Sequence, residues 1–347
     1  MPNKQQAVDI AKVRPRILRV EPLAAIAGGE LHIRGEHFAS EGRPVVKIGN
    51  HSAHLILAGD QYIIARVPDG GGAAGELSVT DGQASSEKVA THVGAQIADS
   101  LHPVANPAVD AEGNVYSTFS GSRGQKSPVS LYKVDTSFNS KPFVTDLMNP
   151  TGLVFDAEGL LYVSSRYDGI VYQVTPSGNM TVYVEGMGVA TGLAFDPEGN
   201  LYVGDRSGTI FKISRSRQIY VYATLEPSIA AYHLAFGPEG YLYVTGPTTS
   251  SFDAVYRVSK AGEVETFFRG LGRPQGAAFD AAGNLYVAAS LKGRRGVIQI
   301  TPERQPEHFL SGPGIVGLAF APDRAMVLAT HNALFRVEVG IAGWPLH

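Results

Sequence analysis

An internal repeat of about 42 residues is the feature of this sequence that most constrains its fold. Each copy consists of a short apolar segment, an acidic turn that usually ends in glycine, and a second apolar segment. The six copies are residues 106–117, 151–163, 191–203, 232–244, 275–287 and 316–328. Repeats of this length are typical of four-stranded β-propeller blades. The sequence therefore predicts six blades arranged around a central axis.

Each repeat can be divided into strands. In the third copy, Gly192–Phe195 forms the first strand, Asp196–Gly199 a hairpin turn, and Leu201–Val203 the start of the second strand. Glycine supplies the positive φ that such a turn requires. A third strand, which alternates strictly and has a polar residue at its third place, recurs at residues 131–134, 171–174, 210–213, 255–258, 297–300 and 334–337. This alternation is typical of a half-buried strand.

The last repeat lacks a convincing fourth strand, since only residues 341–347 remain. An unpaired sheet edge favours aggregation, and closed propellers usually complete the last blade with a strand from the other end of the chain. The segment Lys88–Ile97 is the candidate. Two arrangements are open: either the closing strand begins near Gln96, or one strand runs from the preceding domain into the propeller.

Residues 15–93 have a different pattern, with about seven short strands separated by turn signals. This is typical of a small immunoglobulin-like sandwich. We therefore expect an all-β chain with a polar tail at residues 1–14, a sandwich at residues 15–93 and a six-bladed propeller at residues 94–347.

Particular motifs in both parts resemble known families. Pro15–Pro22 (P-x-I-x-x-V-x-P), Gly28–Phe38 and Val46–Gly49 are similar to the IPT/TIG family, which implies a spacer or interaction domain and a protein partner for it. The G-L-A-F-D-x-x-G-N-L-Y-V cores, over residues 98–340, resemble NHL repeats and the gluconolactonase-like (senescence marker protein) propellers. The second resemblance implies a fold that serves binding platforms, lactonases and lyases alike.

Composition excludes several classes of protein. The net charge is −3, so basic residues do not outnumber acidic ones, which argues against a nucleic-acid partner. The absence of cysteine removes disulfides and thiolate metal sites. No apolar run is long enough for a membrane helix, and the N-terminus lacks the apolar core of a signal peptide. We expect a cytoplasmic protein without membrane contact, or an extracytoplasmic one if a signal peptide has been removed.

The loops divide the charges between the two faces of the propeller. The face with the connections between blades and from second to third strands has three acidic residues and eight basic ones, namely Arg123, Lys126, Arg166, Arg206, Arg273, Lys292, Arg294 and Arg295. The opposite face has twelve acidic residues and six basic ones. A cleft lined by one sign of charge attracts ligands of the other sign. The first face is thus expected to have a basic central mouth, although ordinary solvated arginines would give the same count.

Two sequence features suggest chemistry at this mouth. His233 stands where most blades have glycine, and it could act as a general base if Asp205 or Tyr232 lies within reach. A structural, hydrogen-bonded histidine is the alternative. The pair Asp205–Arg206 could orient a polar ligand or form a local ion pair. His233 and Asp205 are the candidate catalytic residues, and the expected ligand-binding residues are Arg166, Arg206, Tyr232, His233, Gln275, Arg295 and His331.

The gluconolactonase resemblance also implies a divalent cation, held by a glutamate, an asparagine and an aspartate just before the inner strands. The corresponding residues here are Ala105, Thr151, Thr191, Tyr232, Gln275 and Val316, none of which is a carboxylate. Only Asn106 and Asn149 lie nearby. Hard cations require oxygen ligands, preferably charged ones, so we expect no metal and no other cofactor.

These observations favour a binding protein whose basic mouth takes a small anionic molecule or a peptide segment. The alternative is a hydrolase or lyase of the gluconolactonase-like type, with a rearranged site around His233, Asp205, Arg166 and Gln275. Convergence of at least three of these side chains in a deep axial pocket would favour the enzyme. An axis filled by apolar side chains would favour binding at the rim.

Overall fold

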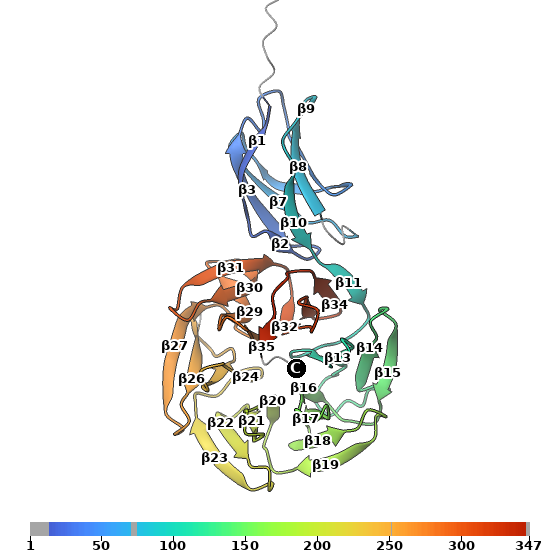
Figure 1. Cartoon of the computed structure of the whole chain (residues 1–347), viewed down its shortest axis with the longest axis vertical. Coiled ribbons are helices and arrows are strands. Elements are labelled where there is room, and N and C mark those ends of the chain that lie inside the picture. Colours follow the sequence, from blue (N-terminus) through green and yellow to red (C-terminus); the bar gives the residue numbers. More distant parts are fainter. Residues whose placement is uncertain (1–13, 71–74, 251, 345–347) are drawn as a thin grey trace, which may run out of the picture.

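The computed structural model describes residues 14–70, 75–250 and 252–344, and within these ranges every regular element is a β-strand. A sandwich stands on the edge of a ring of six blades (Figure 1). The predicted fold class, an immunoglobulin-like domain followed by a six-bladed propeller, is confirmed. Of the predicted polar tail, residues 1–13 lie outside the described residues.

The sandwich consists of two sheets that pack face to face. One sheet has the order β1-β3-β7-β6, with β1 (Arg16–Glu21), β3 (Glu30–Glu36), β6 (His54–Ala58) and β7 (Tyr62–Arg66). The other contains β2 (Ala24–Ala25), β4 (Val45–Ile48), β5 (His51–Ser52), β8 (Gly75–Asp81), β9 (Ala84–Ser85) and β10 (Val89–Val93). Alternate residues such as Leu31, Ile33, Leu77 and Val79 are fully buried between the sheets.

Blades one to four are antiparallel sheets whose four strands follow in chain order from the axis outward. Blade five has the same arrangement, with β35 (Gly343–Trp344) added at the inner edge of its first strand. Blades one and two comprise β12 (Ala108–Val109), β13 (Val115–Thr118), β14 (Leu131–Val134), β15 (Ser140–Val144), β16 (Pro150–Phe155), β17 (Leu161–Ser165), β18 (Ile170–Val174) and β19 (Met180–Val184). Blades three and four comprise β20 (Ala190–Phe195), β21 (Leu201–Asp205), β22 (Thr209–Ile213), β23 (Ile219–Thr224), β24 (His233–Phe236), β25 (Leu242–Thr245), β26 (Asp253–Val258) and β27 (Val264–Leu271). Blade five comprises β28 (Ala277–Asp280), β29 (Leu285–Leu291), β30 (Arg294–Ile300) and β31 (Pro306–Ser311).

Blade six is completed by a strand from the N-terminal side of the ring. Its strands β32 (Ile315–Phe320), β33 (Met326–Thr330) and β34 (Leu334–Val337) are followed on the outside by β11 (Ala95–Ala98), which pairs antiparallel with β34. Gly94 separates β10 of the sandwich from β11. Of the two arrangements that the sequence left open, the separate closing strand is therefore the observed one.

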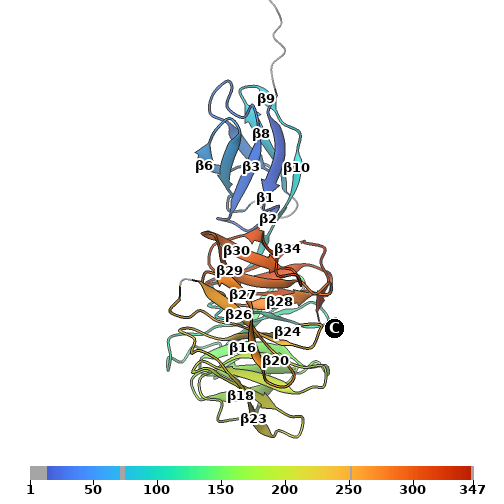
Figure 2. The same cartoon turned by 90° about the vertical axis from the view of Figure 1, so that its left-hand side faces the viewer.

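A continuous sheet crosses the boundary between the domains. Strand β2 lies between β10 and β31 and pairs parallel with both, so the outer edge of blade five is covered by the sandwich (Figure 2). At this junction the Gly94 N–H donates to the Ala25 carbonyl at 2.8 Å. A Cβ at Gly94 would lie 2.8 Å from methyl groups of both Ile26 and Val337, so the junction has room only for glycine.

The aromatic residues that recur in each repeat are explained by packing between blades. The tyrosine of the second strand lies edge-on between two other rings. Tyr202, for example, is 4.8 Å from Tyr222 in its own blade and 4.9 Å from Phe236 in the next, measured between ring centroids. Such edge-to-face pairs contribute about 0.5–1.5 kcal/mol each. The phenylalanine and tyrosine of the motif therefore hold neighbouring blades together.

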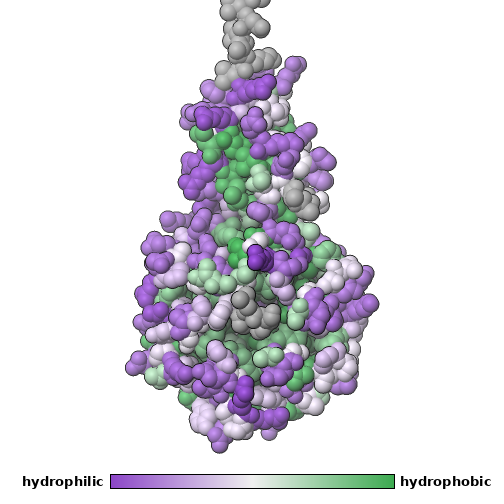
Figure 3. Space-filling view, viewed as in Figure 1, coloured by the Kyte–Doolittle hydropathy of each residue, from purple (hydrophilic) through white to green (hydrophobic). Residues whose placement is uncertain are grey.

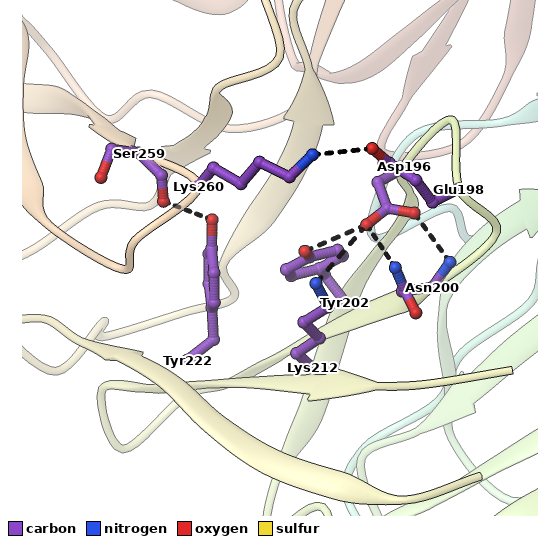
Figure 4. A network of polar contacts seen from close by, with 8 residues as sticks. All are labelled: Asp196, Glu198, Asn200, Tyr202, Lys212, Tyr222, Ser259 and Lys260. Carbon is purple, nitrogen blue, oxygen red and sulfur yellow. Dashed lines mark hydrogen bonds and ion pairs between the residues drawn. The ribbon is translucent and has the colours of Figure 1, made fainter. Parts of the chain in front are cut away.

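The acidic turns form polar networks inside the blades (Figure 4). The Asp196 carboxylate accepts hydrogen bonds from the backbone and side chain of Asn200, both at 2.8 Å, and from the Tyr202 hydroxyl at 3.1 Å. Lys212, the polar residue at the third place of the repeated segment 210–213 in β22, lies 3.9 Å from the same carboxylate. Burial and the nearby Asp196 charge raise the pKa of Tyr202. The repeated acidic, amide and tyrosine residues thus stabilise the hairpins.

Candidate functional site

The end of the propeller channel at which the inner strands begin is narrow, and we call it the narrow end. Glycine occupies an equivalent place in four blades, at Gly152, Gly192, Gly276 and Gly317. A Cβ at Gly192 would lie 2.6 Å from the Tyr232 carbonyl oxygen, and one at Gly276 would lie 2.5 Å from the Cα of Gly317. The backbones of neighbouring inner strands therefore touch here.

Blades one and four, on opposite sides of the ring, have Asn106 and His233 at this place (Figure 1). The side-chain nitrogen of Asn106 donates to the Ala277 carbonyl at 2.9 Å, and its oxygen accepts from the Leu318 N–H at 3.1 Å. Asn106 thus joins blade one to blades five and six. This role has no signal in the repeat pattern apart from the departure from glycine.

His233 is almost completely buried, with 3% of its surface exposed. Burial lowers the pKa of its imidazole to about 4, so the ring is neutral at pH 7. Within the described residues no hydrogen bond links His233 to Asp205 or Tyr232. The predicted partners are engaged elsewhere, because the Tyr232 hydroxyl donates to the Glu226 carbonyl. The expected catalytic arrangement is therefore not assembled.

Asp205 closes a turn. Its carboxylate accepts hydrogen bonds from the Val189 N–H at 2.9 Å, from the Ser207 N–H at 3.2 Å and from the Ser207 hydroxyl. The Arg206 Nε instead donates to the Ser228 carbonyl at 3.2 Å. Neither the ion pair nor the ligand-orienting pair suggested by the sequence is present, since the two side chains serve different parts of the loop.

Two of the expected ligand-binding residues do come together, at the turns that follow β17 and β21. Arg166 is half-buried and donates from Nη2 to the Gly121 carbonyl at 2.8 Å, while its buried Nε has no hydrogen-bond partner among the described residues. Burial lowers the pKa of Arg166, and the positive charges of Arg206 and Arg123 lower it further. We refer to Arg123, Arg166 and Arg206 as the arginine cluster.

The remaining expected residues are not joined to this cluster. The Gln275 carbonyl accepts from the Thr245 hydroxyl, and its N–H donates to Ala288 at 2.8 Å. Arg295 and His331 are exposed on blades five and six. Throughout the described ranges, no hydrogen bond or ion pair connects any of these three side chains to the arginine cluster. The basic central mouth therefore stays a prediction, and the arginine cluster is the part of it whose positive charges act on one another.

The channel widens at its other end, the wide end, where hairpins connect the first and second strands. A cavity of about 800 Å³, the axial cavity, is lined there by apolar residues from all six inner strands and by Trp344 of β35 (Gly343–Trp344). In the space-filling view, hydrophobic residues lie around the centre of the ring (Figure 3). The loop charges of the sequence predict binding at the opposite end, and nothing in the repeat pattern indicates this cavity.

Two smaller cavities lie away from the axis. One of about 600 Å³ separates β1 of the sandwich from β31 and includes the buried His308, and one of about 240 Å³ lies between the hairpins of blades one and six. Burial is the main cause that lowers the pKa of His308 to about 4. None of the residues lining these three cavities is among the seven ligand-binding residues expected from the sequence.

The residues at the narrow end do not fit the divalent cation that the gluconolactonase resemblance implies. Both asparagines near the inner strands already have their side chains engaged, Asn106 as described and Asn149 by the Gly124 N–H and by the carbonyls of Gly121 and Ser122. Among the residues that the structure describes, no group of three or more histidine or carboxylate side chains could hold a metal. A hard cation prefers several charged oxygen ligands, and the described residues bring no such set together.

Comparison with known proteins identifies the N-terminal domain. Residues 15–93 match the family model of the IPT/TIG domain. The sandwich is an IPT/TIG domain. No curated protein matches the chain in sequence.

The described part of the chain contains no helix that could cross a membrane.

Solved structures resemble the propeller or the whole chain. An auxiliary nutrient binding protein from Bacteroides thetaiotaomicron has a TM-score of 0.56 at 12% identity, and the match covers 94% of this chain and 98% of that chain. A gluconolactonase from Xanthomonas campestris has a TM-score of 0.56 at 14% identity, covering 70% and 88%. A virginiamycin B lyase from Staphylococcus aureus has a TM-score of 0.51 at 12% identity, covering 69% and 97%. At such identities the likeness shows the fold and not the activity.

Proposed function

We propose that this protein binds a small anionic molecule at the arginine cluster and does not act as an enzyme. The observation that carries the proposal is the environment of Arg166. Its Nε is buried without a partner among the described residues, and the charges that act on its pKa are both positive. A buried donor without a partner costs about 1–3 kcal/mol, and an anion would supply the acceptor. Arginine is well suited to this because it binds carboxylate or phosphate groups through two parallel hydrogen bonds.

The similarity to nutrient-binding proteins supports binding as the function. The auxiliary nutrient binding protein is matched over both domains, whereas the gluconolactonase and the lyase are matched over about 70% of this chain. We further propose that the IPT/TIG domain orients the propeller or contacts a protein partner, and that an acidic side chain of a peptide segment could occupy the arginine cluster in place of a small molecule.

The alternative is a lactonase-like hydrolase or lyase centred on His233. The resemblance to a gluconolactonase and a lyase favours it, but His233 has a lowered pKa and no hydrogen bond to Asp205 within the described chain. The test measures the hydrolysis of gluconolactone by the protons that it releases. A rate above the uncatalysed one in the wild type, and loss of this rate in His233→Gln, would establish this alternative in place of binding.

The proposal is tested by calorimetric titration with phosphate, gluconate, glucose 6-phosphate and uncharged glucose at constant ionic strength. We expect at least one anion, but not glucose, to bind the wild-type chain. Arg166→Gln should weaken that binding by about tenfold, since a charge-assisted hydrogen bond contributes about 1.5–3 kcal/mol.

The matched control is Arg304→Gln, which removes an exposed arginine from the turn after β30 at the other end of the blades. It should leave the affinity unchanged. Equal affinities of Arg166→Gln and the wild type for every anion that binds, or no binding by any anion, would contradict the proposal.

A further inference from the structure

We propose that the axial cavity is a second binding site, specific for an amphipathic organic anion with an apolar body and one anionic group. This site lies at the opposite end of the channel from the arginine cluster and does not depend on the function proposed above. Its support comes from the walls, from the charges at the mouth and from the position of Trp344.

The walls of the axial cavity suit an apolar body. Its volume of about 800 Å³ is within the range of small-molecule sites, about 300–1,000 Å³. Each blade contributes an apolar residue at the equivalent place of the channel, directly after the glycine position, namely Pro107, Leu153, Leu193, Leu234, Ala277 and Leu318. Asn106 also lines the cavity, but both ends of its amide are already hydrogen-bonded. The interior therefore favours burial of hydrocarbon surface.

Two arginines supply positive charge at the mouth. Arg215 and Arg217, from the turn between β22 and β23, both line the cavity. The Arg217 guanidinium lies 4.8 Å above the centre of the Tyr183 ring, and that of Arg215 lies directly against Gly199, where a Cβ would displace it. In the described part of the chain neither arginine forms an ion pair.

The aspartates that line the cavity are already engaged. Oδ1 of Asp156 accepts hydrogen bonds from the N–H groups of Glu158 and Leu160 at 3.0 and 2.8 Å. The Asp196 carboxylate is held by the Asn200, Tyr202 and Lys212 network described above. Glu158 is exposed. With Lys212, which lies beside Asp196, the side chains around the cavity carry three positive and three negative charges. The anionic group is therefore assigned to Arg215 and Arg217 themselves, which have no ion-pair partner among the described residues.

Trp344 provides a direct readout because it is the only tryptophan in the chain. Strand β35 pairs with β28, with Trp344 opposite Phe279, and Trp344 lines the cavity. Figure 1 shows β35 beside the centre of the ring. An aromatic molecule bound in the cavity would accept excitation energy from this indole. Binding can therefore be followed by the loss of tryptophan emission as well as by emission of the probe.

The test uses 1-anilinonaphthalene-8-sulfonate and N-phenyl-1-naphthylamine, which share an apolar body and differ in the sulfonate. We expect saturable binding of the sulfonate probe to the full chain, with one equivalent at the cavity and quenching of Trp344. The double variant Arg215→Gln/Arg217→Gln should lower the affinity for the sulfonate probe by about tenfold, because it removes charge-assisted contacts. Its affinity for the uncharged probe should be unchanged.

Three control variants locate the probe. Arg304→Gln is the matched surface control, since Arg304 occupies the place of Arg217 in the equivalent turn of blade five and does not line the cavity. It should bind both probes normally, as should Arg166→Gln at the other end of the channel. Ala319→Phe adds a ring to the cavity wall and should lower the affinity for both probes. Circular dichroism melting checks that each variant is folded.

The outcomes are decisive in either direction. Unchanged binding of both probes in folded Ala319→Phe would show that they bind elsewhere and would overturn the site. An equal loss of both probes in the arginine double variant would overturn the assignment of an anionic ligand. Loss of the sulfonate probe in Arg166→Gln, with no effect of the double variant, would place it at the arginine cluster and leave the proposed function standing without this inference.

Discussion

The two ends of the propeller channel are built from the same six strands and yet differ in what they can bind. At the narrow end, glycines let neighbouring backbones touch and Asn106 joins three blades. At the wide end, leucine and alanine side chains line a cavity of about 800 Å³. Within a single strand, the change from glycine to larger apolar residues thus determines where the ring closes and where it opens. Arginines near each end supply the charge.

The largest expected effect breaks the narrow end directly. A Cβ at Gly276 would collide with the Asn106 side chain and lie 2.5 Å from the Cα of Gly317, and these atoms belong to different blades. Gly276→Val should therefore lower the free energy of unfolding by about 3 kcal/mol or more, through forced backbone shifts. Chemical denaturation measures this change. Gly42→Ala, at a site with nothing within 4 Å, is the control, and equal stabilities of the two variants would contradict the close approach.

The burial of His233 at the narrow end predicts a pH dependence. Since burial lowers the pKa of His233 from 6.5 to about 4, the unfolded chain takes up a proton below pH 6.5 that the folded chain does not. Unfolding is then favoured, and the free energy of unfolding should fall by up to about 3 kcal/mol between pH 6.5 and pH 4.

His308, whose pKa is also lowered to about 4, should contribute a loss of the same sign. His233→Gln should therefore flatten the pH profile in part, while replacement of the exposed His331 should leave it unchanged. Urea denaturation at a series of pH values makes the comparison. A profile of His233→Gln that parallels the wild type would show that the ring is hydrated.

A smaller effect is expected at the bridge between blades. Asn106→Ala leaves the Leu318 N–H and the Ala277 carbonyl without their side-chain partner and should cost about 2 kcal/mol. Asn332→Ala, which removes an exposed amide from a turn of blade six, should cost less than about 0.5 kcal/mol. Thermal unfolding by calorimetry separates the two, and similar melting temperatures would mean that water replaces Asn106.

The fold could be predicted because the repeat carries its own turns, strand alternation and spacing. The closing strand near Gln96 could also be predicted, since the last repeat is one strand short. Strand β35 could not be predicted, because two residues carry no pattern and their pairing with β28 depends on the path of the segment that follows β34.

The candidate site was harder to predict because it depends on side-chain direction within loops. The sequence placed Arg166 and Arg206 on one face, and the structure brings them together. It also suggested that His233 projects into the channel as a base, whereas the ring is buried and Asp205 serves as a turn cap. Arg215 and Arg217 were counted among the bases of an acidic face. Their place at the cavity could not be predicted, because the equivalent turns have the same backbone: Arg304 has a φ of 64° against 62° at Arg217 and does not line the cavity.

The pairing of β11 with β34 has a consequence for the order in which the protein is made. Gln96 and Phe335 are partners in this pairing, so the outer strand of blade six leaves the ribosome about 240 residues before its neighbour. The early strand cannot pair with β34 until five complete blades have been synthesised, so closure of the ring through this pair is a late step of assembly. Until then β11 has an unpaired edge, which is the kind of segment that can pair with other chains.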